Sequence, residues 1–316
     1  MARNTHLHAA KRDKQDEFYT QWVDIEKEMN SYLDYNPDVF KDKTILLPCD
    51  DLGWSNFTKF FASRFQDYGI KKIISTSYAG DGGRGKISIF DGVGVGEWSY
   101  LDGDGDFRSD EVTALRDEAD IVVTNPPFSL FRDFMDWLID GDVLFSIIGN
   151  MNAVTYKEIF PLIKSNVIWP GTSFNKTMEF AVPNDYYAKD NAEVDRRGNR
   201  IVKVPAIAWY TNIEHGRRHE HLGLLSMADN LKYSRRKKIR EEGYPKYDNY
   251  DAIEVGFTEA IPSDYEGVMG VPISFLGKYN PEQFEIIKFR HGDDGKDLRV
   301  NGKTPYFRIL LRHKRW

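Results

Sequence analysis

The tetrapeptide Asn125-Pro126-Pro127-Phe128 is the segment whose residue types and spacing most clearly predict a chemical function. An exocyclic amine on a base or an amide is a poor nucleophile because its lone pair is delocalised. If the Asn125 side-chain oxygen and a main-chain carbonyl both accept hydrogen bonds from that amine, the nitrogen moves toward sp3 geometry and its lone pair is exposed. The motif therefore predicts methylation of an amino nitrogen.

The prolines and the phenylalanine suit this chemistry for separate reasons. Pro126 and Pro127 have no N–H, so the segment is stiff and its carbonyl groups are not drawn into sheet hydrogen bonds. Phe128 offers an aromatic face on which a planar base can stack. A plain strand-ending turn is the structural alternative, but a β-branched strand before the motif and a helix after it favour the functional interpretation.

The elements around the motif predict an α/β fold. Apolar and β-branched runs indicate buried strands at 44–48, 72–78, 119–124 and 143–148, and helical spacing of apolar residues indicates helices at 16–34, 55–68, 109–118 and 130–139. This alternation predicts βαβ crossovers and a mostly parallel sheet with helices on both faces. In such sheets ligands bind at the carboxyl ends of the strands, where the Pro48 turn, the Asp106 region and Asn125 would lie.

The remaining sequence predicts an edge hairpin followed by a change of architecture. The apolar segments 178–182 and 206–210 are expected to pair as an antiparallel hairpin at the edge of the sheet. After about residue 220 the pattern changes, and tyrosine, glycine and proline become frequent. We therefore expect two domains, over 1–220 and 221–316, of which the second is a smaller α+β module.

Composition excludes several classes of protein. The 316 residues are 41% hydrophobic, enough for a substantial core, and the single cysteine, Cys49, leaves no intrachain disulfide and no cysteine-based zinc site. The polar N-terminus lacks the apolar segment of a secretory signal, and no apolar run approaches the roughly 18 residues of a membrane span. We expect a soluble cytoplasmic protein without membrane contact.

The charge of the chain is unevenly distributed. The net charge of −6 disfavours nucleic acid as a partner, but residues 1–150 have 16 basic and 27 acidic residues, whereas residues 151–316 have 27 basic and 22 acidic residues. A cluster in the basic half contains Lys232, Arg235, Arg236, Lys237 and Lys238. A solvated helix face and contact with DNA phosphates are equally good interpretations of such a cluster.

Three further patterns fail as phosphate or metal sites. Gly92–Gly96 lacks a strong strand before it and a clear helix after it, so a flexible loop is favoured over a phosphate site. The alternate aspartates at 102–106 have calcium-loop spacing, but Phe107 and Thr113 replace the required glycine and glutamate. The histidines at 215–221 have no acidic or cysteine partner at a suitable spacing. We therefore predict no metal.

Acidic and aromatic residues at strand ends suit S-adenosylmethionine as a methyl donor, because its adenine amine, ribose hydroxyls and amino group all donate hydrogen bonds. These residues lie in Asp16–Thr20 before the first strand, at Asp50 and Asp51 after it, and at Asp106 and Phe107.

Over nearly its whole length the chain resembles the EcoRI-type adenine-specific DNA methyltransferases, which make N6-methyladenine. The matching segments are Asp-Glu-Phe-Tyr-Thr-Gln (16–21), Gly-Asp-Gly-Asp-Phe-Arg-Ser (103–109), Ala-Asp-Ile-Val-Val-Thr-Asn-Pro-Pro-Phe-Ser-Leu-Phe-Arg (119–132), Ile-Ile-Gly-Asn (147–150), Thr-Tyr-Lys-Glu-Ile-Phe (155–160), Trp-Tyr-Thr-Asn-Ile (209–213) and Lys-Tyr-Asn-Pro-Glu-Gln-Phe-Glu (278–285). The resemblance implies a class I methyltransferase, Rossmann-like fold, with a donor-binding catalytic domain over 1–220 and a target-recognition region over 221–316.

The resemblance also implies roles for individual residues. Asn125 and Pro126 would hold the target amine, and Phe128 would stack on the target base. Thr20 would lie near the methionine carboxylate of the donor, and Asp106 would receive the donor's adenine amine. The full donor site would contain Phe18, Tyr19, Thr20, Asp50, Asp106 and Phe107.

The expected function is methyl transfer from S-adenosylmethionine to N6 of an adenine in double-stranded DNA, and the adenine must leave the duplex because N6 is occupied in base pairing. The turn after the first strand offers only Gly53 in place of Gly-x-Gly, and the second strand ends in Ser-Thr-Ser-Tyr without an acidic residue, so the ribose contact is unassigned. The alternatives are methylation of an RNA base or a protein glutamine, and an inactive DNA-binding regulator, which the intact motif disfavours. The oligomeric state is open, and a monomer is compatible with the sequence.

Overall fold

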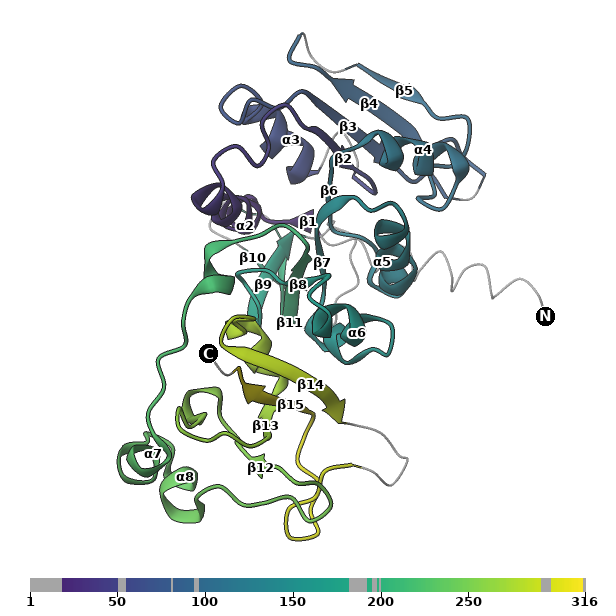
Figure 1. Cartoon of the computed structure of the whole chain (residues 1–316). Coiled ribbons are helices and arrows are strands. Elements are labelled where there is room, and N and C mark those ends of the chain that lie inside the picture. The colour runs from purple at the N-terminus through teal and green to yellow at the C-terminus, as the bar shows by residue number, and fades with distance from the viewer. Residues whose placement is uncertain are drawn as a thin grey trace, which may run out of the picture. The chain divides into compact units, whose positions relative to one another are not determined.

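The computed structural model describes residues 19–50, 55–80, 82–93, 97–181, 192–194, 198, 200–290 and 297–314. The chain divides into two compact units. The first consists of Met1–Met151 and Pro170–His215, and the second of Asn152–Trp169 and Gly216–Trp316. The second unit thus contains the C-terminal region and also a short segment from the middle of the chain (Figure 1). None of the described helices is long and apolar enough to cross a membrane.

A large sheet forms the centre of the first unit, with the strand order β1-β9-β11-β7-β6-β2-β3-β4-β5 along its main path. Its strands are β1 (Tyr19–Thr20), β2 (Thr44–Leu47), β3 (Lys72–Ser77), β4 (Lys86–Phe90), β5 (Trp98–Tyr100), β6 (Ile121–Thr124), β7 (Leu144–Asn150), β9 (Lys176–Ala181), β10 (Ala192–Val194) and β11 (Arg200–Thr211). The two-residue strand β8 (Trp169–Pro170) lies where the chain passes between the units.

The middle of this sheet is parallel and its edges are antiparallel. Strands β7, β6, β2 and β3 pair in parallel. An antiparallel pair of β9 and β11 is present, as predicted, but residues 201–204 of β11 face residues 178–181 of β9. The predicted partner segment 206–210 pairs mainly with β7 instead, because β11 is long enough to cross from one neighbour to the other. A second antiparallel hairpin, β4–β5, extends the other edge beyond β3. The predicted α/β class is confirmed, and the parallel strands are those that place the Asn125 turn.

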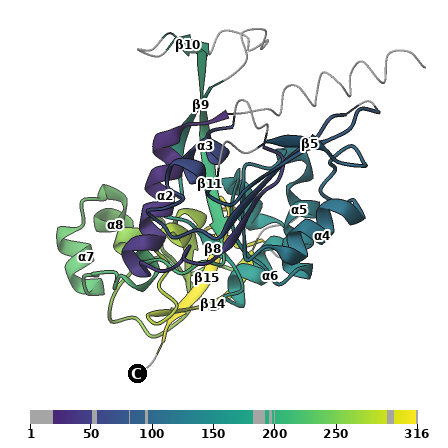
Figure 2. The same cartoon turned by 90° about the horizontal axis from the view of Figure 1, so that it is seen from above.

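Helices cover both faces of the parallel strands, as Figure 2 shows. The helices α2 (Trp22–Tyr35) and α3 (Asn56–Ser63) lie on one face, and α4 (Asp110–Glu118) and α5 (Phe131–Asp140) lie on the other. Ile45 and Leu47 of β2 pack into one core cluster with α2 and α3, while the intervening Leu46 is equally buried outside that cluster. Burial on both faces explains why these strands are continuous apolar runs.

The start of α2 differs from the sequence prediction. The expected helix over 16–34 begins only at Trp22, because Tyr19 and Thr20 pair with Ala181 and Phe180 of β9. The helical spacing of apolar residues does not reveal that the preceding residues have a strand partner more than a hundred positions away.

The position of α2 is fixed by a buried carboxyl group. Glu28 accepts hydrogen bonds from the Thr172 main-chain N–H at 3.0 Å, the Thr172 hydroxyl at 2.7 Å and the Tyr32 hydroxyl at 3.0 Å. A Cβ atom at Gly171 would lie 2.0 Å from the Glu28 carboxyl, so only glycine fits there. Because its polar partners are complete, Glu28 can be fully buried in the core.

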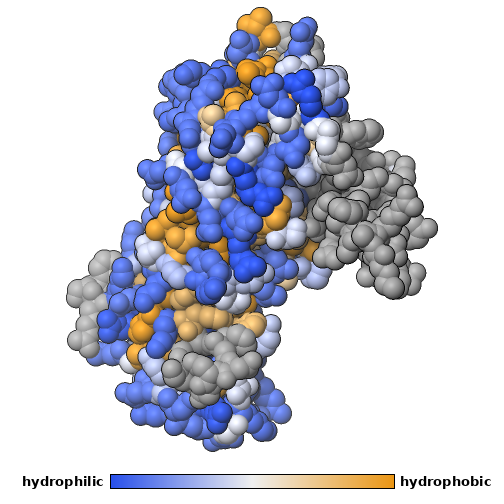
Figure 3. Space-filling model, turned by 90° about the vertical axis from the view of Figure 1, so that its right-hand side faces the viewer, coloured by the Kyte–Doolittle hydropathy of each residue, from blue (hydrophilic) through white to orange (hydrophobic). Residues whose placement is uncertain are grey.

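The β4–β5 hairpin leaves large side chains at the surface. Ile89, Val93, Trp98 and Tyr100 are each at least half exposed. Figure 3 shows hydrophobic surface at the upper end of the molecule, the region of β4 and β5 in Figure 1. The core is therefore concentrated at the parallel strands, and this hairpin forms the solvated margin of the sheet.

The second unit is a small α+β module, as predicted. Its four-stranded sheet has the order β12-β13-β15-β14, with β12 (Ile253–Glu254), β13 (Met269–Pro272), β14 (Phe284–Arg290) and β15 (Arg308–His313). Its helices are α6 (Ile159–Lys164), α7 (Met227–Tyr233) and α8 (Lys237–Glu242). Helix α6 belongs to this unit because Phe160 packs on Phe289 of β14 with ring centroids 5.4 Å apart.

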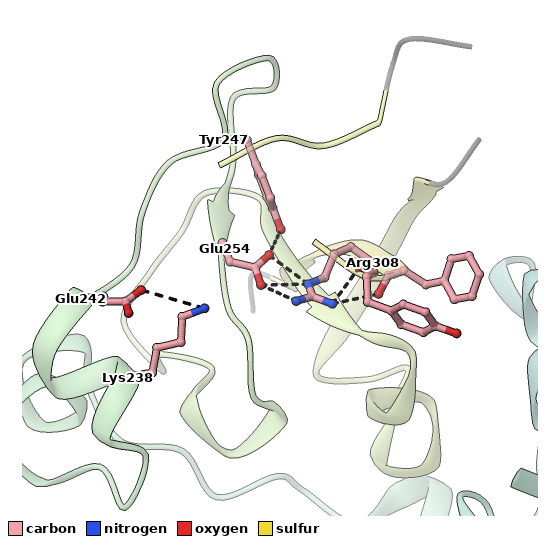
Figure 4. Close-up of polar contacts among 7 residues, drawn as sticks. Lys238, Glu242, Tyr247, Glu254 and Arg308 are labelled. Carbon is pink, nitrogen blue, oxygen red and sulfur yellow. Dashed lines mark hydrogen bonds and ion pairs between the residues drawn. The ribbon is translucent and has the colours of Figure 1, made fainter. Parts of the chain in front are cut away.

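A buried ion pair joins β12 to β15 in this unit (Figure 4). The Arg308 Nε lies 3.0 Å and 2.9 Å from the two Glu254 carboxylate oxygens, and the side chains are only 11% and 9% exposed. The Tyr247 hydroxyl also donates to Glu254. By contrast, the Lys238–Glu242 pair in the same view is 3.9 Å long and its side chains are 60% and 61% exposed.

We expect Glu254→Gln to lower the free energy of unfolding by about 3 kcal/mol or more, because it leaves the Arg308 guanidinium buried without its counter-charge. The matched variant Lys238→Gln breaks an exposed pair and should cost less than about 1 kcal/mol. Urea unfolding followed by fluorescence and circular dichroism measures both values. Equal, small effects of the two substitutions would contradict the assignment of Glu254 and Arg308 as a buried pair.

Candidate active site

The turn after β2 is organised by the buried carboxylate of Asp50. This residue is 6% exposed, and its oxygens lie 2.5 Å from the Ser55 hydroxyl and 3.2 Å from the Thr124 hydroxyl. Ser55 also caps α3, because its hydroxyl oxygen accepts from the Phe57 N–H at 3.0 Å. The hydroxyl of Thr124, the last residue of β6, has one hydrogen, which is shared between the Asp50 carboxylate and the Pro48 carbonyl. The ends of β2 and β6 and the start of α3 are therefore joined in one network.

The Asn125 motif follows directly at the carboxyl end of β6, as predicted. Asn125 and Phe128 are half-buried, and Pro126 is buried. A single-turn helix, η1 (Phe128–Leu130), begins in the motif, and the Leu130 N–H donates to the Pro127 carbonyl at 3.0 Å. Phe128 packs at the margin of the core cluster. The side chain of Asn125 is thus placed at the strand end by a turn that is itself anchored in the core.

Thr20 is held at the same edge of the sheet by α3. The Asn56 side-chain amide donates to the Thr20 carbonyl at 2.7 Å. Thr20 is 3% exposed, and its hydroxyl has no hydrogen-bond partner among the described residues. A buried unpaired hydroxyl is costly, so this position fits a polar group supplied by a ligand. Phe18 lies outside the described residues, as does the side chain of Tyr19.

The Asp106 loop lies against the end of β3. The Ala79 N–H donates to the Asp104 carbonyl at 2.9 Å. Gly105 has a φ of 84°, and a Cβ atom there would lie 2.3 Å from the Ser77 carbonyl oxygen. Glycine is therefore required for both the backbone conformation and the close approach that places Asp106.

Asp106 and Phe107 have different surroundings. Arg108 binds the Asp106 carboxylate through Nε at 3.0 Å and Nη2 at 2.6 Å, and these hydrogen bonds hold the pKa of Asp106 below its ordinary value. The ring of Phe107 is 3% exposed and packs against Phe134 and Trp137, with centroids 4.8 Å and 5.6 Å away. Asp106 offers an ionised acceptor at the surface, whereas Phe107 fixes the loop to α5.

The only cysteine of the chain, Cys49, directly precedes Asp50 in the turn after β2. Burial raises the pKa of the Cys49 thiol, and the carboxylates of Asp50 and Asp106 raise it further. Cys49 is therefore protonated at neutral pH and is a poor nucleophile, as the sequence indicated.

The structure brings Thr20, Asp50, Asp106 and Asn125 to one edge of the first unit. The residues fit a donor such as S-adenosylmethionine in two respects: the Thr20 hydroxyl is buried and unpaired among the described residues, and the Asp106 carboxylate is partly exposed. Asp50 lies in the turn after β2, as predicted, and its contacts with Ser55 and Thr124 fix the shape of that turn. Its predicted contact with the donor stays a prediction.

Sequence reasoning missed the residues that connect these segments. Ser55 is the first residue of the helix predicted over 55–68, and a serine at a helix start is an N-cap signal. Thr124 and Asn56 had no signal, because their partners Asp50 and Thr20 lie 74 and 36 positions away. The described residues contain no group of three histidine, cysteine, aspartate or glutamate side chains that could hold a metal ion.

The predicted DNA-contacting cations lie on α7, α8 and their connection in the second unit, and all five are exposed. Three of them are paired: Arg236 with Glu259 at 2.6 Å, Lys237 with Glu241 at 3.4 Å and Lys238 with Glu242 at 3.9 Å. The Lys232 ammonium lies 4.8 Å from the ring centroid of Tyr233. Within the described part of the chain, neither Lys232 nor Arg235 has a carboxylate at ion-pair distance.

The family model and the known proteins that this chain resembles are all methyltransferases. The family model described as "Adenine-specific methyltransferase EcoRI" matches residues 6–92 and 87–314. The chain is 47% identical to the type II methyltransferase M.EcoRI of Escherichia coli, over 99% of this chain and 98% of that protein. It is 37% identical to the type II methyltransferase M.MgeORF184P of Mycoplasma genitalium and 35% identical to M.MpnI of Mycoplasma pneumoniae, each over at least 97% of both chains. No solved structure gives a significant match.

The close approach at Gly105 provides a test of the site's geometry. Gly105→Ala should lower the free energy of unfolding by about 2 kcal/mol or more, because the new methyl group meets the Ser77 carbonyl as well as an unfavourable φ. Gly82→Ala is the matched control, since Gly82 has a φ of 76° but no atom within 4 Å of the added carbon. It should cost about 1 kcal/mol. Thermal unfolding compares the two, and equal destabilisation would argue against the contact with Ser77.

Proposed function

The chain belongs to the EcoRI family of adenine-specific methyltransferases and is a DNA methyltransferase; on this premise we propose that it methylates N6 of an adenine that has left the duplex, with S-adenosylmethionine as donor. The observation that supports this most directly is the position of Asn125-Pro126 at the carboxyl end of β6, directly after the Thr124–Asp50 contact. Acceptors at this point suit an amine and do not suit a phosphate or a carboxylate.

Asn125 and Pro126 would bind the target nitrogen. The Asn125 side-chain oxygen and the Pro126 carbonyl would accept the two N6 hydrogens, orienting the lone pair and increasing its availability. Phe128 would stack on the extruded base and offset part of the few kcal/mol that unstacking costs. When bound, the donor would supply an electrophilic methyl group, and Asn125 and Pro126 would direct the N6 lone pair toward it. Alignment and electrostatics then account for catalysis.

The donor site would use the residues around the Asp50 network. The Thr20 hydroxyl, which is buried, would bind the donor's methionine carboxylate, and the Asp106 carboxylate would accept from its adenine amine. Phe107 would support the ring from its place against α5. Asp50 would keep the turn after β2 in the shape that the donor requires, through Ser55 and Thr124.

The second unit would provide phosphate contacts. In the cluster, Lys232 and Arg235 would gain the most binding free energy from contact with a phosphate. The other three cations already have carboxylate partners. The exposed ring of Tyr233 lies beside Lys232 and would contact sugar or base. These contacts would fix the position of the duplex without reading its sequence.

We expect Asn125→Ala to lower methyl transfer at least about 100-fold, because one of the two acceptors for the target amine is lost. The affinities for DNA duplex and for S-adenosylhomocysteine should stay within a few-fold of wild type. Labelled-methyl transfer to a duplex, with an RNA of the same sequence as a second substrate, measures the effect. Full activity of the variant would refute the site, and labelling of RNA alone would refute DNA as substrate.

We expect the double variant Lys232→Gln/Arg235→Gln to weaken duplex binding and to reduce the slope of log affinity against log salt by about 2, because two phosphate contacts are removed. The matched variant Lys237→Gln/Lys238→Gln removes two cations that have carboxylate partners, and it should change the slope by less than about 1. Fluorescence anisotropy at several salt concentrations gives both slopes. Equal slopes for the two variants would contradict the proposal that Lys232 and Arg235 contact phosphate more strongly than Lys237 and Lys238 do.

A further inference from the structure

We propose that Arg108 is a positioning residue for donor recognition, because it holds the Asp106 carboxylate so that one oxygen faces the adenine amine of the donor. The inference rests on the proposed donor role of Asp106. Arg108 lies in the Gly-Asp-Gly-Asp-Phe-Arg-Ser segment, and nothing in the proposed reaction has used it.

The hydrogen bonds of the pair distinguish the two carboxylate oxygens. Asp106 Oδ1 accepts from the Arg108 main-chain N–H at 2.9 Å and from its Nε at 3.0 Å, whereas Oδ2 accepts only Nη2, at 2.6 Å, from this residue. An ionised carboxylate has about two acceptor sites on each oxygen. Arg108 therefore fills Oδ1 and leaves one site on Oδ2, which is the site that would accept the donor amine.

The guanidinium group is itself held in place. Its central carbon lies 5.4 Å from the ring centroid of Phe107, and Nη1 lies 3.8 Å from the Asp133 carboxylate on α5. Phe107 in turn packs on Phe134 of the same helix. A planar group with contacts to a ring and to two carboxylates has few orientations. The Arg108 guanidinium therefore fixes the position of the Asp106 carboxylate relative to α5.

The pair does little for the stability of the fold. The Arg108 and Asp106 side chains are 52% and 25% exposed and only two positions apart, and exposed pairs of this kind contribute little to folding. The lowered pKa of Asp106 is consistent with a role in binding, because the carboxylate stays ionised as the pH falls. The contacts of Arg108 are therefore explained better by recognition of the donor base than by folding.

The test compares Arg108→Gln with wild type by calorimetric binding of two ligands, S-adenosylhomocysteine and its deaminated analogue S-inosylhomocysteine, which lacks the amine. In Arg108→Gln the affinity for S-adenosylhomocysteine should fall roughly tenfold, while that for the analogue stays within about threefold. Arg108→Lys should restore little, because an ammonium cannot bind both oxygens at once. Arg64→Gln is the matched control, since Arg64 pairs with Glu26 at 2.9 Å and is 37% exposed.

The pH dependence gives a second measurement. Arg108 lowers the pKa of Asp106, so removing it should raise that pKa toward its ordinary value. The loss of S-adenosylhomocysteine affinity on acidification should then begin at a higher pH in Arg108→Gln than in wild type, while the melting temperature stays within about 2 °C. A role in folding alone would lower the melting temperature and would leave the pH profile and the choice between the two ligands unchanged.

The variant Asp106→Asn distinguishes a failure of the donor role of Asp106 from a failure of the positioning role of Arg108. If this variant retains wild-type affinity and discrimination between the ligands, the donor role of Asp106 is wrong. If Asp106→Asn loses the discrimination but Arg108→Gln matches wild type in affinity, discrimination and pH profile, Asp106 contacts the donor and the positioning role of Arg108 is overturned.

Discussion

The burial of the Asp50 carboxylate is the constraint on which the candidate site depends. A buried carboxylate is tolerated only with hydrogen-bond donors around it, and here Ser55 and Thr124 supply them. Ser55 caps α3, the adjacent Asn56 holds Thr20, and Thr124 directly precedes Asn125. One set of hydrogen bonds thus sets the relation between the proposed donor-binding strand and the proposed target-binding turn.

The two units divide the proposed functions according to their charge. Residues 1–150, which make up most of the first unit, are acidic and contain carboxylates that suit the amine and hydroxyl groups of the proposed methyl donor. Residues 151–316, which include the whole second unit, are basic and contain the cations that suit phosphate. Within the basic cluster, the local ion pairs matter more than the number of cations, because a cation already beside a carboxylate gains less from a phosphate. The net charge of the whole chain therefore says little about its partner.

Sequence patterns anticipated the parts of the structure that depend on nearby residues. The buried strands around Asn125 and the turn that follows β6 were predictable, because apolar runs and prolines act locally. The strand at Tyr19–Thr20, the membership of α6 in the second unit and the partners of Asp50 were not, since each depends on contacts with residues distant in sequence. Arg108 lies only two positions from Asp106, but no sequence pattern indicates that its guanidinium binds that carboxylate.

Cys49 has a practical consequence for the study of this enzyme. It is the chain's only cysteine, and because its pKa is raised, little of it is present at neutral pH as the thiolate that attacks maleimide dyes. Cysteines introduced at exposed positions of the two units, such as Tyr35 and Tyr306, would then react selectively without removal of the native residue. A fluorophore pair attached in this way would report the distance between the units while the protein searches DNA, binds and turns over.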